Sequence, residues 1–484
     1  MSMTTLARAA ALIGEATVLG DETVEFARVV TDSRQAGPGD LFVALRGERF
    51  DAHGFVAAVG AQGAAAALVD AQGGAVAPLQ QVHEETGLPL LRTADTRLAL
   101  GALAAGWRRG FTLPVVAVTG SNGKTTVKEM IAAIFAAAVG KSRRLATAGN
   151  LNNDIGVPLT LLRLDATHQL AVIELGMNHP GETAVLARMC APTVALINNA
   201  QREHQEFMAS VAAVADEHAA ALSALADDGV AVFPAFDPFS AVWHRAAGAR
   251  RVLTFALDDD LGDAEAMAQR AADVVGRLDA NGELTVTCAE GRFIVTLAIP
   301  GRHNARNALA ATACALGAGV TLDAIGAGLA AFQPVSGRLQ RLLARCERLA
   351  GATVIDDSYN ANPDSVRAAI DVLAEAVRPR VLVLGDMGEV GEHGEAFHRE
   401  VGAYARERGL DALFVLGPQT QASWQAFAGA APARGGHFAS HEALFEALGE
   451  TYGGEATILV KGSRYMKMER VVDALTLRDA SRGH

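Results

Sequence analysis

The sequence predicts an α/β fold of three domains. These are a small N-terminal α/β domain, a central mostly parallel sheet of the P-loop ATPase kind, and a C-terminal Rossmann-like domain. The chain has 484 residues, which is too long for one ordinary core because single domains run to about 100–200 residues. Half of its residues are apolar. Short apolar runs that end in polar or glycine residues alternate with helix-length segments, as in parallel sheets covered on both faces.

The N-terminal domain is predicted over residues 1–95. Between Asp40 and Thr93 the apolar runs DLFVAL, AAAALVD and LPLLRT alternate with polar and glycine-containing stretches. This alternation indicates a small α/β domain. A linking helix is predicted over residues 96–113, between this domain and the next.

The central domain is predicted over residues 114–334 and the C-terminal domain over 335–484. In the central domain the strands are PVVAVTG, LAVIELG, TVALINN and GVAVFPA, followed by a hairpin at LTVTCAEGRFIVTLAIPG. In the last domain they are TVIDDSYNANP, PRVLVLGDMGE, LFVLGPQ and ATILVKGSR. Each of these runs leads into a loop, which is typical of a doubly wound sheet.

Charge and cysteine content exclude several classes of protein. The chain carries 42 basic and 54 acidic side chains, a net charge of -12, which argues against a nucleic-acid partner held by a basic surface. The four cysteines include no CxxC pair, so neither a zinc cage nor a disulfide framework is indicated, and we expect a reducing cytoplasm. The alanine-rich stretches are shorter than the roughly 20 residues of a membrane span.

The stretch TGSNGKTT, residues 119–126, follows an apolar strand and opens a helix. Gly120 and Gly123 allow the backbone to curl until its N–H groups face phosphate oxygens at the positive end of the helix. Lys124 would neutralise phosphate charge, and Thr125 is placed to offer its hydroxyl to Mg²⁺. Val118 stands where the strict P-loop has a glycine, so this is a shortened variant. The predicted phosphate-binding residues are Gly120, Ser121, Asn122, Gly123, Lys124, Thr125 and Thr126.

This turn leaves kinase, motor, transporter and ligase open, so residues further along the chain must decide. Glu174 ends the strand LAVIE, where a parallel sheet would present a carboxylate to Mg²⁺; the alternative is a solvated acid at a strand end. His204 follows the next strand and could serve a second metal, or be structural.

Amides and other polar side chains gather at several further loops. Asn150, Asn152 and Asn153 could hydrogen-bond an anionic reaction centre without adding charge, although plain turn chemistry explains them equally well. The run GRHNARNALAA places Asn304 and Asn307 at a helix start, where amides read a base edge or cap the helix. The runs DDSYNANPDS and LVKGSRYMKME gather acids, amides and tyrosines at strand ends.

Together, the motifs TGSNGKTT, GNLNNDIGVP, IELGMNHPGE, GRHNARNALAA, SGR, DDSYNANP, LGDMGE and KGSR resemble those of the Mur ligases of peptidoglycan synthesis. The resemblance runs in order from about Thr31 to Glu469. DDSYNANP and LGDMGE favour the members that join D-alanyl-D-alanine to UDP-N-acetylmuramoyl-tripeptide. The resemblance implies a monomeric enzyme that uses ATP and Mg²⁺ to form a peptide bond through an acyl phosphate. The alternatives are a sister Mur ligase, a folylpolyglutamate-type ligase, or an ATP-gated binding module without catalysis.

The resemblance also implies roles for individual residues. Lys124, Glu174 and His204 would be catalytic, and Thr125, Glu174 and His204 would hold metal. Family members often carry a carbamylated lysine where this chain has His218, so either the imidazole substitutes directly or the second ion is held otherwise. Nucleotide contacts are expected from Asn304, Asn307, Arg338, Asp356, Tyr359 and Asn360. Contacts to the UDP-peptide are expected from Ser33, Arg34, Phe42, Ala44, Asp51, His53, Asn150, Asn152 and Asn153.

Overall fold

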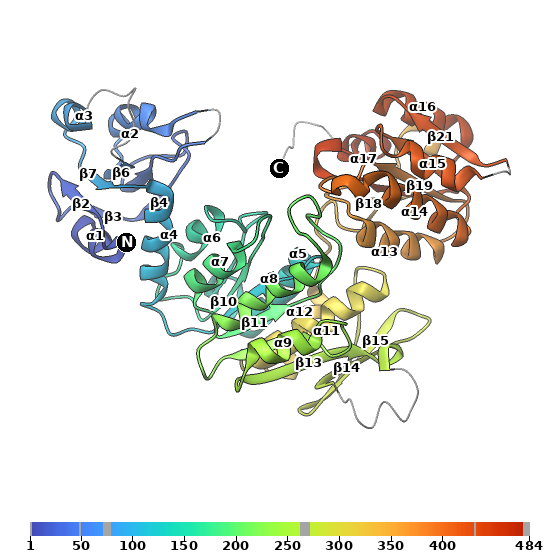
Figure 1. The fold of residues 1–484 in the computed structure, drawn as a ribbon, viewed down its shortest axis with the longest axis horizontal. Helices are drawn as coiled ribbons and strands as arrows, with labels where there is room; N and C mark the ends of the chain where they lie inside the picture. The colour runs from blue at the N-terminus through green and yellow to red at the C-terminus, as the bar shows by residue number, and fades with distance from the viewer. Residues whose placement is uncertain (1, 48–49, 71–78, 262–271, 430–431, 478–484) are drawn as a thin grey trace.

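The computed structural model describes residues 2–47, 50–70, 79–261, 272–429 and 432–477. Figure 1 shows three α/β units in chain order, coloured blue, cyan to yellow, and orange to red. Helix α4 (Thr96–Arg108) lies between the first two units, beginning at the first residue of the predicted linking helix and ending five residues before its predicted end. The predicted α/β fold class is confirmed.

The N-terminal unit is built on a five-stranded sheet of order β2-β7-β6-β5-β4. Strand β2 is antiparallel to β7, and the other neighbours are parallel. Strands β1 and β3 form a separate antiparallel pair. The elements are β1 (Thr4–Thr5), α1 (Leu6–Ile13), β2 (Thr17–Leu19), β3 (Glu25–Phe26), β4 (Arg28–Val30), β5 (Asp40–Val43), α2 (Val56–Ala61), β6 (Ala66–Asp70), α3 (Leu79–Thr86) and β7 (Leu90–Thr93).

The central unit carries a nine-stranded sheet of order β16-β15-β14-β13-β12-β11-β8-β10-β9. All neighbours from β9 to β14 are parallel, and β15 and β16 form the predicted antiparallel hairpin. Its strands are β8 (Val115–Thr119), β9 (Arg144–Ala146), β10 (Leu170–Glu174), β11 (Val194–Ile197), β12 (Val230–Pro234), β13 (Arg251–Leu257), β14 (Val274–Leu278), β15 (Glu283–Cys288) and β16 (Gly291–Thr296). Its helices are α5 (Lys124–Val139), α6 (Gly156–Leu161), α7 (Glu182–Cys190), α8 (Val211–Ser223), α9 (Ser240–Ala247), α11 (Arg302–Gly317) and α12 (Leu322–Ala331).

Both faces of this sheet are buried, as the near-continuous apolar strands predict. Successive residues of a strand point to opposite faces. Val116 and Val118 of β8 therefore pack with apolar residues of α5, α11 and α12, whereas Val115 and Ala117 pack with those of α4, α7 and α8. The sheet is thus held rigidly between two helical layers, and the carboxyl ends of its strands meet along one edge.

The C-terminal unit has a six-stranded sheet of order β17-β18-β22-β19-β20-β21. Only the pair β17 and β18 is antiparallel. The strands are β17 (Gln340–Leu343), β18 (Thr353–Asp357), β19 (Arg380–Gly385), β20 (Ala412–Leu416), β21 (Arg434–Phe438) and β22 (Thr457–Lys461). The helices are α13 (Pro363–Ala374), α14 (Gly394–Glu407), α15 (Gln421–Ala428), α16 (His441–Thr451) and α17 (Glu469–Thr476).

The start of α13 is fixed by its own sequence. Asn362 caps the helix by accepting from the backbone N–H of Ser365, whose hydroxyl accepts in return from the backbone of Asn362. Pro363 occupies the first helical position, where its missing N–H costs nothing. This start places Asp364 in the first turn, facing the central unit.

Helices long and apolar enough to cross a membrane do not occur among the described residues. The four cysteines, Cys190, Cys288, Cys314 and Cys346, are all free thiols, consistent with the expectation that they form no disulfide framework.

Candidate active site

A cavity of about 1790 Å³ lies between the central and C-terminal units. The glycine turn, the end of β10 and the loop after β11 line it from the central side, and the loops after β18 and β22 from the other. The crevice beyond the carboxyl ends of parallel strands is the usual ligand site of such sheets. Charged, polar and aromatic side chains of both units line it, among them Lys124, Thr125, Asn152, Glu174, Glu203, His204, Asn304, Asn307, Arg338, Asp357, Tyr359 and Lys461.

The glycine turn has the geometry that its sequence predicts. It runs from the end of β8 at Thr119 to the start of α5 at Lys124. Gly123 has a φ of 83°, and a Cβ there would lie 2.6 Å from Asn307 Oδ1 and 2.7 Å from Asn198 Nδ2. Only glycine fits so close an approach at this backbone angle. The free N–H groups at the start of α5 therefore face the cavity, as a phosphate site requires.

Lys124 lies across this turn. Its Nζ donates to the carbonyl oxygens of Gly120 (2.5 Å) and Ser121 (3.2 Å) and lies 3.4 Å from Glu203 Oε2. The side chain is largely buried, with 15% of its surface exposed. The ammonium is therefore fixed at the mouth of the turn, beside the cavity.

Glu174 fits the predicted place for a cation. Its side chain is buried at the end of β10, and Oε1 accepts from Thr125 Oγ1 (3.1 Å) and Asn152 Nδ2 (2.8 Å). Oε2 is buried and has no hydrogen-bond partner among the described residues. A buried carboxylate oxygen without a donor is costly, whereas an oxygen ligand set of this kind suits Mg²⁺, which binds through one or two carboxylates together with substrate phosphates.

The three asparagines of the loop before α6 have different roles. Asn152 alone contacts Glu174. Asn153 Oδ1 accepts from the backbone N–H groups of Ile155 and Gly156 at the start of α6, which is turn chemistry. Asn150 is exposed and does not line the cavity.

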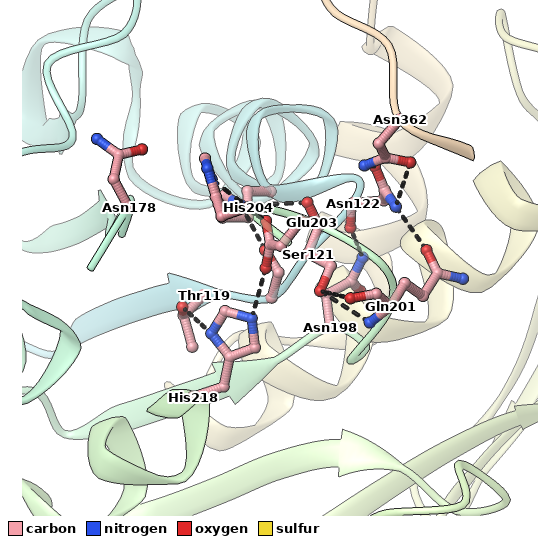
Figure 2. A network of polar contacts seen from close by, with 12 residues as sticks. Thr119, Ser121, Asn122, Asn178, Asn198, Gln201, Glu203, His204, His218 and Asn362 are labelled. Carbon is pink, nitrogen blue, oxygen red and sulfur yellow. Dashed lines mark hydrogen bonds and ion pairs between the residues drawn. The ribbon is translucent and has the colours of Figure 1, made fainter. Parts of the chain in front are cut away.

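Successive residues of the loop after β11 contact the glycine turn and the C-terminal unit in alternation. Gln201 accepts from Asn122 of the glycine turn (2.6 Å), and Glu203 faces Lys124. Between them, Arg202 contacts Asp364 on α13, and directly after them His204 Nδ1 lies 2.6 Å from Glu389 Oε2 of the C-terminal unit. Figure 2 shows Gln201, Glu203 and His204 beside the turn. Residues 201–204 thus contact both the glycine turn and the C-terminal unit from one short segment of the chain.

The amides of α11 join the same network. Asn307 Oδ1 accepts from Asn198 Nδ2 (2.9 Å), and Asn307 Nδ2 donates to Asn304 Oδ1 (3.0 Å). The helix has Gly301 at its N-cap and no side-chain cap among the described residues. The helix-capping interpretation of these asparagines is therefore wrong, and both line the cavity beside Gly123.

Comparison with known proteins identifies the family. Three family models match in chain order: "Mur ligase family, catalytic domain" at residues 25–108, "Mur ligase middle domain" at 118–315, and "Mur ligase, glutamate ligase domain" at 337–464. UDP-N-acetylmuramoyl-tripeptide--D-alanyl-D-alanine ligase of Escherichia coli K12 is 43% identical over 449 residues, covering 92% of this chain and 93% of that protein. This chain belongs to the Mur ligase family. The predicted resemblance is confirmed.

Further relatives agree with this assignment. The ligase of the same name from Haemophilus influenzae is 37% identical over 472 residues, covering 96% of this chain and 97% of that protein. A crystal structure of MurF from Acinetobacter baumannii has a TM-score of 0.84 at 32% identity and covers 98% of this chain and 99% of its own. The MurF ligase from Thermotoga maritima in complex with ADP has a TM-score of 0.76 at 24% identity, covering 94% and 98%, and shows the shared fold.

In this Mur ligase the expected metal residues fall into two groups. Thr125 and Glu174 are hydrogen-bonded to each other, whereas His204 lies with Glu203 and Glu389. No three His, Cys, Asp or Glu side chains form a metal cage within the part of the chain that the structure describes. The Thr125 hydroxyl and the Glu174 carboxylate are oxygen atoms of the kind that Mg²⁺ prefers, and both residues line the cavity.

His218 does not face the cavity. It is fully buried on α8, with Nδ1 2.9 Å from Thr119 Oγ1 and Nε2 2.9 Å from Glu203 Oε1. Both ring nitrogens are engaged by protein atoms, which disfavours direct substitution for a metal-binding carbamate. Sequence reasoning missed its partner Glu203, although an acid directly before His204 was a signal that could have been followed.

Burial raises the pKa of Glu203, but the nearby charge of Lys124 and the hydrogen bond from His218 outweigh it and hold that pKa far below the ordinary value. The hydrogen bond from His204 lowers the pKa of Glu389. Burial lowers the pKa of His303 to about 4, assisted by the charges of Lys461 and Arg306. His303 is therefore neutral at physiological pH.

From the C-terminal unit, aromatic and charged side chains reach the cavity. The Arg338 guanidinium lies 4.2 Å from the ring centroid of Tyr359. Lys461 Nζ donates to Asp357 Oδ2 (2.5 Å) and to the carbonyl of Asn360 (3.0 Å). Arg338, Tyr359 and Asn360, three of the expected nucleotide contacts, line the cavity.

The predicted Asp356 is turned away from the cavity. Its carboxylate accepts from the backbone of Gly337 and from the hydroxyl of Ser358, and it does not line the cavity. Its neighbour Asp357, which was not singled out from the sequence, lines the cavity. Adjacent strand residues point to opposite faces, so only one of the two aspartates can reach the site.

Of the residues expected to contact the UDP-peptide, the six in the N-terminal unit lie away from this cavity. Phe42 and Ala44 are fully buried, so any contact from them would be through the backbone. His53 is buried and lies between Asp51 Oδ1 and the backbone N–H of Asp70. The remaining two expected residues, Ser33 and Arg34, are partly buried and exposed, respectively.

Proposed function

We propose that this chain joins D-alanyl-D-alanine to UDP-N-acetylmuramoyl-tripeptide in an ATP-dependent reaction. The observation that carries the proposal is the 43% identity to the E. coli ligase of that name over nearly the whole chain. The glycine turn, Lys124 and the unpartnered oxygen of Glu174 support it, because they suit the phosphates and cation of ATP.

An amine does not displace an oxygen from a free carboxylate, because that oxygen is a poor leaving group. We propose that an oxygen of the tripeptide carboxylate attacks the γ-phosphorus of ATP and that ADP departs, leaving an acyl phosphate. The amine of D-alanyl-D-alanine then forms the new bond to the acyl carbon, phosphate leaves, and the amine loses a proton. Both partners of the first step are anions, so positioning and charge neutralisation supply the rate.

The chain's own residues suit these tasks. Lys124 and the N–H groups at the start of α5 would bind the terminal phosphates, and Thr125 and Glu174 would hold Mg²⁺. When bound, Mg²⁺ neutralises negative charge on the phosphates. Asn304, Asn307, Arg338, Tyr359 and Asn360 line the same cavity as candidate nucleotide contacts. The C-terminal unit covers the site and would exclude water, which hydrolyses an acyl phosphate.

We assign the UDP-binding role to residues 1–95, ATP binding to 114–334, and dipeptide delivery to 335–484. Of the expected UDP contacts, the exposed Arg34 is placed to meet a ligand through its side chain, whereas the buried His53 supports the loop that carries Asp51. We further propose that the chain acts as a monomer in the cytoplasm.

The test is a ligation assay with ATP, Mg²⁺ and UDP-N-acetylmuramoyl-tripeptide carrying either diaminopimelate or lysine as its third residue. Product is expected with D-alanyl-D-alanine and not with glutamate or diaminopimelate as the added amine. Dependence on glutamate would indicate a sister or folylpolyglutamate-type ligase. Phosphate release indifferent to both substrates would indicate an ATP-gated module without ligase chemistry.

A further inference from the structure

We propose that Glu203 and His218 act as a positioning pair for Lys124: Glu203 orients the ammonium toward the phosphate to be transferred, and His218 holds Glu203 in place. The inference rests on the ATP-dependent reaction proposed above. It assigns to these two side chains a role that they perform through Lys124.

A line of polar contacts runs from the sheet to the glycine turn. Thr119 ends β8, and its Oγ1 lies 2.9 Å from His218 Nδ1. His218 Nε2 lies 2.9 Å from Glu203 Oε1, and Glu203 Oε2 lies 3.4 Å from Lys124 Nζ. In Figure 2, dashed lines join Thr119 to His218 and His218 to Glu203. The strand, a helix and a loop thus fix the environment of one ammonium group.

The chemistry of the donors fixes the direction of these bonds. An ionised carboxylate only accepts, so Nε2 of His218 carries the hydrogen and donates to Glu203. In the neutral ring Nδ1 is then an acceptor for the hydroxyl of Thr119. His218 therefore has one orientation in which both nitrogens are satisfied, and this orientation aims Glu203 at Lys124.

The contact between Glu203 and His218 is buried. His218 is fully buried and Glu203 is 6% exposed. The loss of a contact is therefore costly, because an unpaired buried carboxylate is strongly unfavourable. The neighbouring Arg202 is engaged by Asp364 and Glu400, and His204 faces Glu389. Lys124 is thus the cation that balances Glu203 most directly.

The contacts of Lys124 differ in length. The bond to Gly120 is short (2.5 Å), whereas those to Ser121 (3.2 Å) and Glu203 (3.4 Å) are long. The ammonium can therefore turn one N–H donor to a phosphate oxygen while it keeps its contacts with the Gly120 carbonyl and the Glu203 carboxylate. Orientation of this kind matters most in the transition state, where charge on the transferred group is spread over its oxygens.

The first test is Glu203→Gln, which keeps the size of the side chain and an acceptor for His218 but removes the charge facing Lys124. We expect kcat to fall about tenfold or more, with KM for ATP and the Mg²⁺ requirement changed less than about threefold. Wild-type kcat would overturn the proposal. So would recovery of kcat at high Mg²⁺, because Glu203 would then be a metal ligand.

The matched control is Glu206→Gln. Glu206 lies in the same loop and is exposed, so the same chemical change should leave kcat within about twofold of wild type. Equal losses in both variants would show that any charge change in this loop impairs the enzyme, and would contradict a role specific to Glu203.

His218 is tested with two replacements. Glutamine places an amide N–H near the position of Nε2 and can still donate to Glu203, whereas leucine cannot. We expect His218→Gln to retain at least about fivefold more activity than His218→Leu. In the Glu203→Gln background, His218→Leu should cost less than about a further twofold, because the two residues act as one unit. Equal activity of the two His218 variants, or fully additive losses, would overturn the pair.

ADP binding and thermal unfolding distinguish the possible failures. Each variant should bind ADP within about threefold of wild type and unfold cooperatively, which separates misorientation of Lys124 from loss of the fold. Loss of ADP binding by Glu203→Gln would contradict a role confined to the transferred phosphate. Failure of the proposed function would instead appear as wild-type protein that makes no ligation product.

Discussion

Arg202 of the central unit and Asp364 of α13 are joined by both backbone and side-chain hydrogen bonds. The backbone N–H of Arg202 donates to Asp364 Oδ2 (2.9 Å), and its Nη2 donates to Oδ1 (2.6 Å). Arg202 also contacts Glu400 on α14 (2.7 Å) and lies over the ring of Phe397. Because Glu203 follows directly in the chain, we expect docking of the C-terminal unit to affect the environment of Lys124.

Replacing Arg202 with alanine should therefore slow ligation. The contact is only partly exposed, at 22% for each of Arg202 and Asp364, and it is bidentate, so it is stronger than a surface ion pair. We expect kcat to fall about tenfold and the radius of gyration measured by small-angle X-ray scattering to rise. Arg399→Ala removes an exposed ion pair to Glu395 and is the control. Unchanged turnover and radius in Arg202→Ala would contradict the linkage.

Replacing Lys124 with alanine should abolish ligation in a folded protein. The ammonium is the positive side chain of the glycine turn, and loss of such a group costs about a thousandfold in kcat. Turnover is measured beside circular dichroism, which should match wild type. Near-normal turnover would remove the role given to this turn.

Replacing Glu174 with glutamine should leave the stability without metal little changed but remove the response to Mg²⁺. Without metal, the unpartnered Oε2 is replaced by an equally unpartnered amide N–H group, so the free energy of unfolding should stay within about 1 kcal/mol of wild type. With ADP present, the additional rise in Tm caused by Mg²⁺ should disappear. Differential scanning calorimetry with chelator and with Mg²⁺ checks both effects. A variant that still responds to Mg²⁺ would place the ion elsewhere.

The contact at Glu400 should respond to acid. The hydrogen bond from Arg202 lowers the pKa of Glu400, and burial opposes this. Because the pKa of Glu400 is lowered in the folded state, its contribution to the contact with Arg202 is complete above the ordinary glutamate pKa. This contribution is lost as the pH falls through the lowered pKa. We expect the radius of gyration to increase in that acidic range in the wild type, with a weaker dependence in Glu400→Gln. Identical profiles for the two proteins would contradict this contribution, which is small because Glu400 is 34% exposed.

Much of the candidate site follows from local rules. Gly120 to Thr125 could be predicted because a glycine turn between a strand and a helix has one dominant use, and Glu174 because parallel strands deliver their last residues to one edge. Six strands of the nine-stranded sheet, namely β8, β10, β11, β12 and the hairpin of β15 and β16, follow from the lengths and spacing of the apolar runs, whereas β9, β13 and β14 were not predicted.

The remainder depends on tertiary packing. Asp356 and Asp357 are equivalent in sequence, and only the pleat of β18 decides that Asp357 lines the cavity. The contact between Glu203 and His218 spans a loop and a helix, so no periodicity reveals it. The same holds for Arg202, whose partners lie 162 and 198 residues away in the chain.

The most direct test of the central claim follows the oxygen of the tripeptide carboxylate. UDP-N-acetylmuramoyl-tripeptide labelled there with a heavy oxygen isotope is ligated to D-alanyl-D-alanine, and the released phosphate is analysed by mass spectrometry. Attack of that carboxylate on ATP predicts one labelled oxygen in each phosphate. Unlabelled phosphate from a complete ligation would contradict the account.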